Sequence, residues 1–138
     1  MDQQRWVRAV LVAFGAGEAG VGSWAQVAPS SFYTDFPGWP WHGWVTYDGP
    51  FNEHLIRDFG GLNLALAVTL VGAAIIGSVA AARVAGAASL VFSLPHTIFH
   101  WAHIEHYPPV DQVPAVATAA VGVLVAVIAL LVPGRAPS

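Results

Sequence analysis

Four long apolar stretches alternate with shorter polar segments along this chain. Each stretch is close to the ~20 residues that a helix needs to cross a hydrocarbon core. Proline, glycine and charged residues gather between them, and these end helices or face water. The pattern predicts an all-α fold, a four-transmembrane-helix bundle that forms a single integral membrane domain over residues 1–138. The helices are expected at about residues 6–28, 62–82, 84–106 and 112–132, with a long outer loop at residues 29–61.

Composition strengthens this interpretation. Of the 138 residues, 56% are hydrophobic and only 9% are charged. A soluble domain of this length has too little interior to hide so much apolar surface, whereas a lipid bilayer accepts it on the outside. The chain has no cysteine, which excludes disulfides and thiolate metal sites. The net charge of −3 gives no reason to expect a nucleic-acid partner. The apolar composition makes the lipid bilayer the expected environment.

The arginines predict the orientation. Arg5 and Arg8 precede the first stretch, Arg83 lies between the second and third, and Arg135 follows the fourth, so four of the five basic residues share one side. Arg57 is the exception, and it lies beside Asp58 and close to Glu53. Basic residues concentrate on the cytoplasmic side of membrane proteins. We therefore expect a multi-pass protein of the bacterial plasma membrane with both termini inside (N-in/C-in), a long extracytoplasmic loop between helices 1 and 2, and Trp41 outside.

Histidines follow one face of the third stretch. At 100° per residue, His96, His100 and His103 fall within a stripe about 60° wide, and His106 lies at its edge. Pro95 removes a backbone donor beside the deepest of them, and such a break at membrane depth is tolerated where protein or a wet cavity covers it. The stripe is therefore expected to face the interior of the bundle.

One carboxylate lies inside an apolar stretch. Glu18 is about ten residues in from the outer end of the first stretch, and His96 lies about as far in from the outer end of the third. An unpaired charge there would cost about 2.5–3.5 kcal/mol or more. We therefore expect Glu18 to be paired with histidine or bound to a metal.

A second polar group precedes the second apolar stretch. If residues 51–58 are helical, His54 and Asp58 share a face at a spacing of i,i+4, and Glu53 and Arg57 share the neighbouring face. In the expected topology these side chains lie at the same outer end as the histidine stripe.

These residues predict a His/carboxylate site that opens to the extracytoplasmic side. Neutral imidazole and carboxylate suit Zn, Cu or Fe, and two facing histidines could hold haem. We therefore expect a transition metal or haem as cofactor, with a role in redox chemistry or metal handling. The candidate metal ligands are His96, His100, His103, Glu18, Glu53, His54 and Asp58.

Other interpretations stay open at this point. Glu18 and the histidines could relay protons between the middle of the membrane and the outside without any cofactor. The histidines could also simply donate to carbonyls of neighbouring helices and hold the bundle together. The fourth stretch has no ionisable residue between Ala115 and Val132, so it could equally meet lipid, a second copy or a partner. The chain would then be an accessory or structural subunit of a larger membrane complex.

Two segments carry a resemblance. Residues 52–65 (NEHLIRDFGGLNLA) and residues 94–100 (LPHTIFH) resemble uncharacterised small four-span membrane proteins of actinobacteria. The resemblance covers about the middle half of the chain and implies the same four-helix architecture, but it brings no activity with it. A vaguer likeness to DoxX-type four-helix proteins rests on hydropathy alone.

Overall fold

The computed structural model describes residues 3–133, which are almost entirely helical and contain no strand. The fold class predicted from the sequence, all-α, is therefore confirmed for this part of the chain. The elements in chain order are α1 (Gln3–Val27), α2 (Pro29–Asp35), the 3-10 helix η1 (Trp44–Asp48), α3 (Glu53–Ile76), α4 (Val79–Ala102), the 3-10 helix η2 (Ile104–His106) and α5 (Pro109–Leu130).

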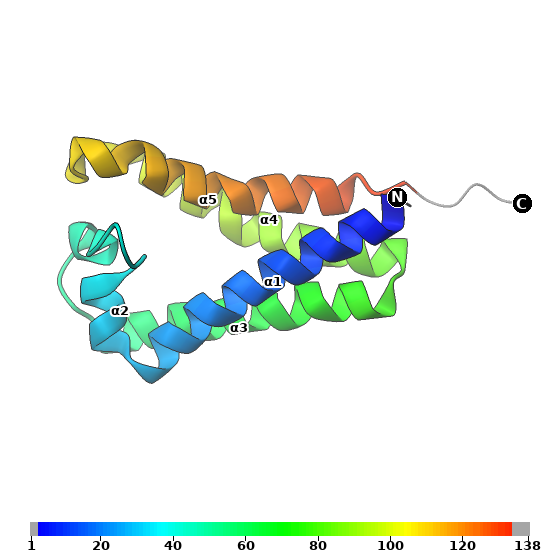
Figure 1. Ribbon diagram of the computed structural model, residues 1–138, viewed down its shortest axis with the longest axis horizontal. Helices are drawn as coiled ribbons and strands as arrows, with labels where there is room; N and C mark the ends of the chain where they lie inside the picture. Colours follow the sequence, from blue (N-terminus) through cyan, green and yellow to red (C-terminus); the bar gives the residue numbers. More distant parts are fainter. Residues whose placement is uncertain (1–2, 134–138) are drawn as a thin grey trace, which may run out of the picture.

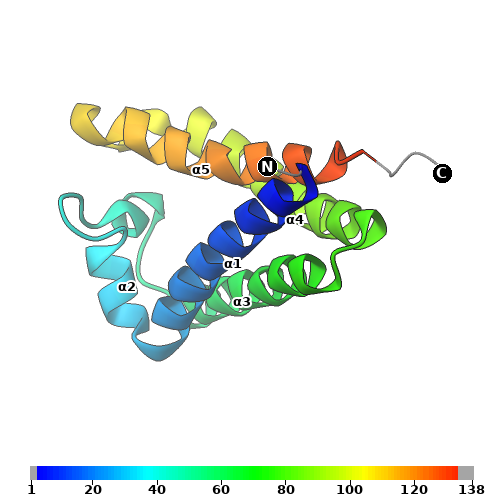
Figure 2. The ribbon, with the colours of Figure 1, turned by 45° about the vertical axis from the view of Figure 1, so that its right-hand side comes forward.

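The four long helices form two pairs, α1 with α3 and α4 with α5 (Figure 1). At one end of the bundle α1 begins, α3 turns into α4 and α5 ends, and we call this the turn end. At the opposite end lie α2, η1 and η2, and we call this the loop end. The pairs lie together at the turn end and diverge toward the loop end, as the view in Figure 2 also shows.

Glycine allows the helices of each pair to approach closely. A Cβ atom built on Gly22 of α1 would lie 2.7 Å from the carbonyl oxygen of Gly60 in α3. In the other pair, a Cβ on Gly86 of α4 would lie 2.8 Å from the carbonyl oxygen of Ala126 in α5. Small residues at such crossings let backbones pack without side chains between them, as is common in membrane bundles.

The main hydrophobic core joins the two pairs at the turn end. All four long helices contribute to it, and most of its members are small or branched. They are Val7, Leu11, Leu66, Leu70, Ala73, Ala74, Ala82, Ala85, Val125, Ala129 and Val132. Contact between the pairs is therefore apolar in this half of the molecule.

The helix boundaries differ from those expected. α3 begins at Glu53 rather than near residue 62, because Asn52 caps it by accepting from the N–H of Leu55. Gly60 and Gly61 lie inside the helix, where Gly60 packs against α1 instead of ending a loop. The outer loop is correspondingly shorter than residues 29–61, and α2 occupies part of it.

The third and fourth expected helices also shift. Ser78 caps α4 through the N–H of Ala81, so Arg83 lies in the helix rather than in the turn. α4 continues through Pro95 but ends at Ala102, which leaves His103 as its C-cap residue. The last helix begins at Pro109, slightly earlier than predicted.

Three helices among the described residues, α3, α4 and α5, are long and apolar enough to cross a bilayer. Three of the four helices expected to cross the membrane meet this criterion, and α1 does not. α1 is long enough, but its sequence includes Arg5, Arg8, Glu18 and Gln26 as well as several glycines. Three apolar helices are compatible with an integral membrane protein of several spans.

Candidate functional site

The loop end is held together by aromatic side chains. Phe32 of α2 is buried between α1 and α3, and Trp44 of η1 is buried against Tyr107, next to α5. Phe36 contacts both groups, with ring centroids 4.7 Å from Phe32 and 6.3 Å from Trp44. The segment between α1 and α3 therefore bridges the two helix pairs where they diverge.

A chain of polar side chains starts at this bridge. The hydroxyl of Tyr107 lies 3.4 Å from each carboxylate oxygen of Asp48, to which it donates. The same hydroxyl lies 3.1 Å from Nδ1 of His100. Asp48 comes from the end of η1, His100 from the last turn of α4, and Tyr107 from the turn before α5. Asp48 and the segment that carries His100 and Tyr107 are distant in sequence, and they meet at this phenol oxygen.

His96 continues this chain into the helical region. Its ring meets that of His100 edge-on, with centroids 4.5 Å apart. On its other sides it stacks on Phe92 at 5.2 Å and on Phe59 of α3 at 6.3 Å. His96 is half-buried and lies one helical turn deeper than His100. We call Asp48, Tyr107, His100 and His96 the polar chain.

The electrostatics of its outer members have clear causes. Loss of hydration raises the pKa of the Asp48 carboxyl, although His100 and the Tyr107 hydroxyl act in the opposite direction. Burial, and then the negative charge of Asp48, raise the pKa of the Tyr107 phenol well above its ordinary value. The phenol therefore keeps its proton at physiological pH. Asp48 itself stays exposed to solvent, while Tyr107 is 3% exposed.

The remaining histidines of the expected stripe, His103 and His106, are not part of the polar chain. Nδ1–H of His103 donates to the carbonyl oxygen of Phe99, 2.8 Å away, and the His103 ring stacks on the Phe99 ring. His106 lies in η2, outside the helix, with its ring 5.6 Å from that of His103. Because α4 ends at Ala102, the stripe does not continue as one helical face beyond His100.

The expected metal ligands meet in pairs only. Within residues 3–133, no group of three or more His, Asp or Glu side chains is placed to hold a metal ion. His96 and His100 are in contact, but the carboxylate nearest to them through the hydrogen-bonded chain is Asp48, not one of those expected. The predictions of a metal and of haem stay predictions without support from this arrangement.

Glu18 is half-buried in the middle of α1. It makes no hydrogen bond or ion pair with any residue in the described part of the chain, so its expected partnership with His96 is not formed here. The ring of His96 instead contacts α3, through Phe59. Glu18 and the polar chain are thus separate features.

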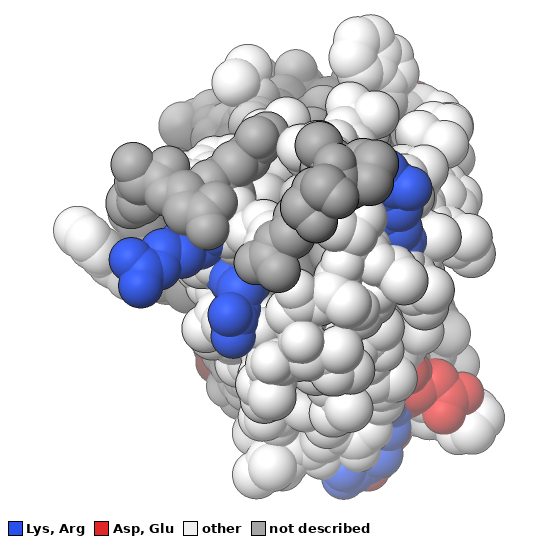
Figure 3. Space-filling model, turned by 90° about the vertical axis from the view of Figure 1, so that its right-hand side faces the viewer, with Lys and Arg blue, Asp and Glu red and all other residues white. Residues whose placement is uncertain are grey.

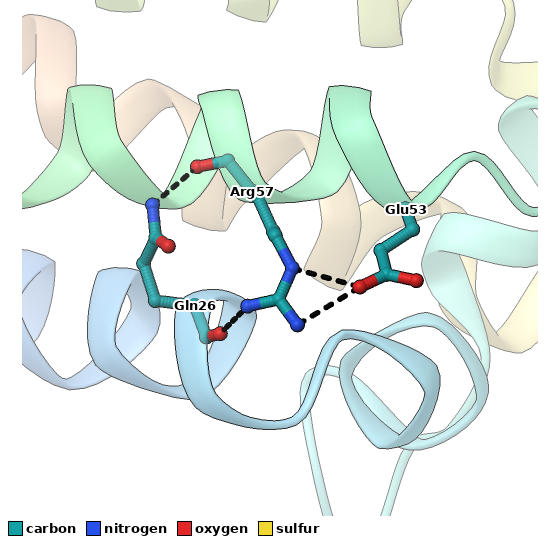
Figure 4. A network of polar contacts seen from close by, with 3 residues as sticks. All are labelled: Gln26, Glu53 and Arg57. Atoms are coloured by element: carbon teal, nitrogen blue, oxygen red, sulfur yellow. Dashed lines mark hydrogen bonds and ion pairs between the residues drawn. The ribbon is translucent and has the colours of Figure 1, made fainter.

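Glu53, His54 and Asp58 lie on the first turns of α3 and pair as their spacing indicates. His54 Nε2 lies 3.3 Å from Asp58, and Arg57 bonds Glu53 at 2.9 Å. Arg57 also donates to the carbonyl oxygen of Gln26, whose amide donates back to the Arg57 carbonyl oxygen at 2.6 Å (Figure 4). The two contacts between Arg57 and Gln26 anchor the start of α3 to the end of α1, and the carboxylates of Glu53 and Asp58 are exposed.

Sequence reasoning identified His96 and His100 but missed Asp48 and Tyr107. Asp48 precedes Gly49-Pro50 and Tyr107 precedes Pro108-Pro109, which indicates turns rather than a site. A signal was available, since both are polar residues adjoining glycine or proline next to a predicted membrane surface. Tyr107 follows His100 by only seven residues, but nothing in the spacing along the chain relates Asp48 to either of them.

Comparisons with known proteins give no relative: no protein-family model, curated protein or solved structure matches the chain.

Proposed function

We propose that the chain is a four-span integral membrane protein in which α1 crosses the bilayer beside α3. The support comes from packing. Gly15 and Gly22 of α1 both lie against α3, next to Leu70 and Gly60 respectively. Two antiparallel helices in such extended contact lie at similar depth, and α3 is apolar enough to span. The polar groups of α1 do not prevent this, because a partly covered carboxylate is tolerated within a bundle.

We propose further that the loop end faces outward. Arg5, Arg8 and Arg83 all belong to the turn end, around which basic side chains gather in Figure 3. The described acidic residues lie from Glu18 onward toward the loop end. This asymmetry favours a cytoplasmic turn end and an extracytoplasmic loop end, in the bacterial plasma membrane.

The function that the site supports best is proton transfer between the outer face and the interior of the bundle. The carrying observation is the phenol oxygen of Tyr107, which contacts a solvent-exposed carboxylate on one side and an imidazole on the other. When Asp48 is protonated, its hydroxyl can donate to the phenol oxygen, and the phenol hydroxyl then turns to donate to Nδ1 of His100 in the tautomer that carries its proton on Nε2. The Asp48 proton moves to the phenol oxygen as the phenol proton moves to Nδ1. Atoms and charge balance, since His100 becomes imidazolium and Tyr107 ends neutral.

The polar chain ends inside the protein. Among the described residues no polar contact continues the chain beyond His96, whose ring packs on Phe92 and on Phe59. The arrangement is therefore a half-channel that loads a proton from outside, rather than a pore through the membrane. Such a site suits a protein that couples proton binding to a second process. That process can take place in this chain or in a larger complex that contains it.

Titration of His100 in lipid nanodiscs tests this function, with nitrogen-15 NMR of labelled histidine. Replacing Tyr107 by Phe removes only the hydroxyl, so we expect the His100 signal to lose its hydrogen-bonded shift and its titration midpoint to move. Tyr33→Phe is the matched control, because it removes a 2.8 Å bond to the Gly49 carbonyl oxygen without touching His100. An unchanged His100 titration in Tyr107→Phe would refute the relay.

Metal content is a separate outcome of the same preparation. Stoichiometric Zn, Cu, Fe or haem in the wild type, lost in His100→Ala, would favour the metal prediction over proton transfer. A partner protein that co-purifies with the wild type, with Tyr107→Phe and with His100→Ala alike would favour the role of an accessory subunit.

A further inference from the structure

A groove lies between α1 and α3 at the turn end. Its volume is about 430 Å³, within the range of small-molecule binding sites. Its walls are almost wholly apolar, and a single charged side chain stands among them. The lining residues are Arg8, Ala9, Val12, Ala13, Ala74 and Ile75.

Arg8 is fixed at the edge of this groove. Its Nε donates to the carbonyl oxygen of Ala74 at 2.7 Å. Its guanidinium also lies over Gly77, the left-handed C-cap of α3, where a Cβ would be 3.5 Å from Cζ. These contacts leave the two terminal nitrogens without a hydrogen bond to any residue between 3 and 133. The Arg8 guanidinium thus presents two terminal N–H donor groups at the edge of an apolar groove.

The surroundings make this position attractive to an anion. Arg5 lies one turn earlier on α1, and Arg83 lies on the first turns of α4, at the same end. No described acidic residue lies nearer along α1 than Glu18, ten positions away. Arginine binds phosphate through paired donors, and basic pockets between spanning helices bind anionic headgroups.

We propose that this groove binds an anionic phospholipid, with its phosphate on Arg8 and an acyl chain along Val12, Ala13 and Ile75. Val12 and Ala13 lie on the bilayer side of Arg8, about one helical turn further from the start of α1, and Ile75 lines the groove opposite them on α3. Val12 and Ile75 are 46% and 72% exposed, so lipid can reach them. The inference rests on the proposed membrane position of α1, and it is independent of the proton site.

Native mass spectrometry of the purified protein tests the proposal, with phosphatidylglycerol and phosphatidylcholine as probes. We expect the wild type to retain phosphatidylglycerol about fivefold more strongly, the effect of one arginine near a membrane surface. Arg8→Gln should abolish this preference. Arg83→Gln removes a charge from the same end but not from the groove, and should retain it. Equal retention of both lipids by the wild type, or an unchanged preference in Arg8→Gln, would overturn the proposal.

A second variant separates the groove from the charge. Ala13→Phe adds a ring to an exposed groove position and leaves Arg8 in place. We expect it to lower retention of both lipids, whereas retention equal to that of wild type would contradict an acyl chain in the groove.

A thiol probe distinguishes failure of this inference from failure of the four-span proposal. Gly17 is exposed on α1 with nothing within 4 Å of a built Cβ, so Gly17→Cys introduces a unique thiol without a clash. If α1 crosses the bilayer, a water-soluble maleimide cannot reach this thiol in membranes. A protected thiol with no lipid preference would overturn the lipid site alone, whereas rapid labelling would overturn the position of α1 as well.

Discussion

The two ends of this bundle are packed through different kinds of side chain. At the turn end, four helices meet through alanine, valine and leucine, and Gly86 brings α4 against α5. At the loop end, the helix pairs diverge, and aromatic and polar side chains of α2, η1 and η2 connect them. The contrast teaches where change can occur, since close-packed small residues fix one geometry, whereas a phenol between a carboxylate and an imidazole has two hydrogen-bonding states.

The largest effect is expected at the turn end. Gly86→Ala would place a Cβ 2.8 Å from the Ala126 carbonyl oxygen and 2.9 Å from the Ala129 Cβ, and neither can move independently of α5. We expect a loss of about 1–3 kcal/mol of stability, the usual cost of overpacking. Gly72→Ala, where nothing lies within 4 Å, is the control and should be neutral or slightly stabilising. Unfolding in mixed micelles, followed by tryptophan fluorescence, measures both; similar stabilities would mean that the α4–α5 contact is not tight.

At the loop end, Tyr107→Phe is expected to cost less. It removes one phenol hydroxyl that contacts Asp48 and His100, a loss of about 1 kcal/mol for a hydrogen bond that is only partly shielded from water. The same unfolding assay measures it. A loss of unfolding free energy as large as that in Gly86→Ala would show that the polar chain mainly stabilises the fold, rather than holding a proton that can move.

The Asp48 carboxyl makes stability at the loop end dependent on pH. Because its pKa is raised in the folded protein by loss of hydration, folding favours the protonated form. Its stabilising contribution is present below the ordinary carboxyl pKa of about 4 and is lost as pH rises through the raised value. Asp48→Asn should therefore be more stable than wild type at pH 7, by less than about 1 kcal/mol because the side chain is exposed.

Unfolding at pH 4 and at pH 7 checks this prediction. The advantage of Asp48→Asn should disappear at the lower pH. Asp58→Asn, an exposed carboxylate elsewhere at the loop end, controls for the change in net charge. A wild type that becomes more stable between pH 4 and pH 7 relative to Asp48→Asn would reverse the sign and refute it.

The smallest effect is expected for Glu53→Gln. This change weakens an exposed i,i+4 pair with Arg57, which is worth about 0.3–0.5 kcal/mol. Arg57→Gln should cost more, because Arg57 also donates to the Gln26 carbonyl oxygen between α1 and α3. Equal losses in the two variants would mean that the contact between the helices contributes nothing.

The long helices could be predicted from periodicity and hydropathy, because the residues that form a helix are close together in the sequence. Boundaries were wrong where a tertiary contact decides the outcome. Gly60 looks like a helix breaker in the sequence, but in the bundle it is the residue that lets α3 approach α1. Likewise α1 counted as a span from its apolar run, although its polar residues make it the least apolar of the long helices.

The candidate site was predicted only in part, for a similar reason. The i,i+4 spacing on α4 brought His96 and His100 together correctly, as it did His54 and Asp58 on α3. Asp48 and Tyr107 are 59 residues apart, and they meet because the loop folds back between the helix pairs. No local pattern encodes that contact.

The difference between the two ends is most directly tested by their sidedness in cells. The chain has no cysteine, so His42→Cys at the loop end and Ala80→Cys at the turn end each introduce one exposed thiol. A membrane-impermeant maleimide applied to intact cells should label position 42 at once and position 80 only after permeabilisation. Labelling of position 80 in intact cells, with position 42 protected, would place the polar chain on the cytoplasmic side and contradict an outward-facing proton site.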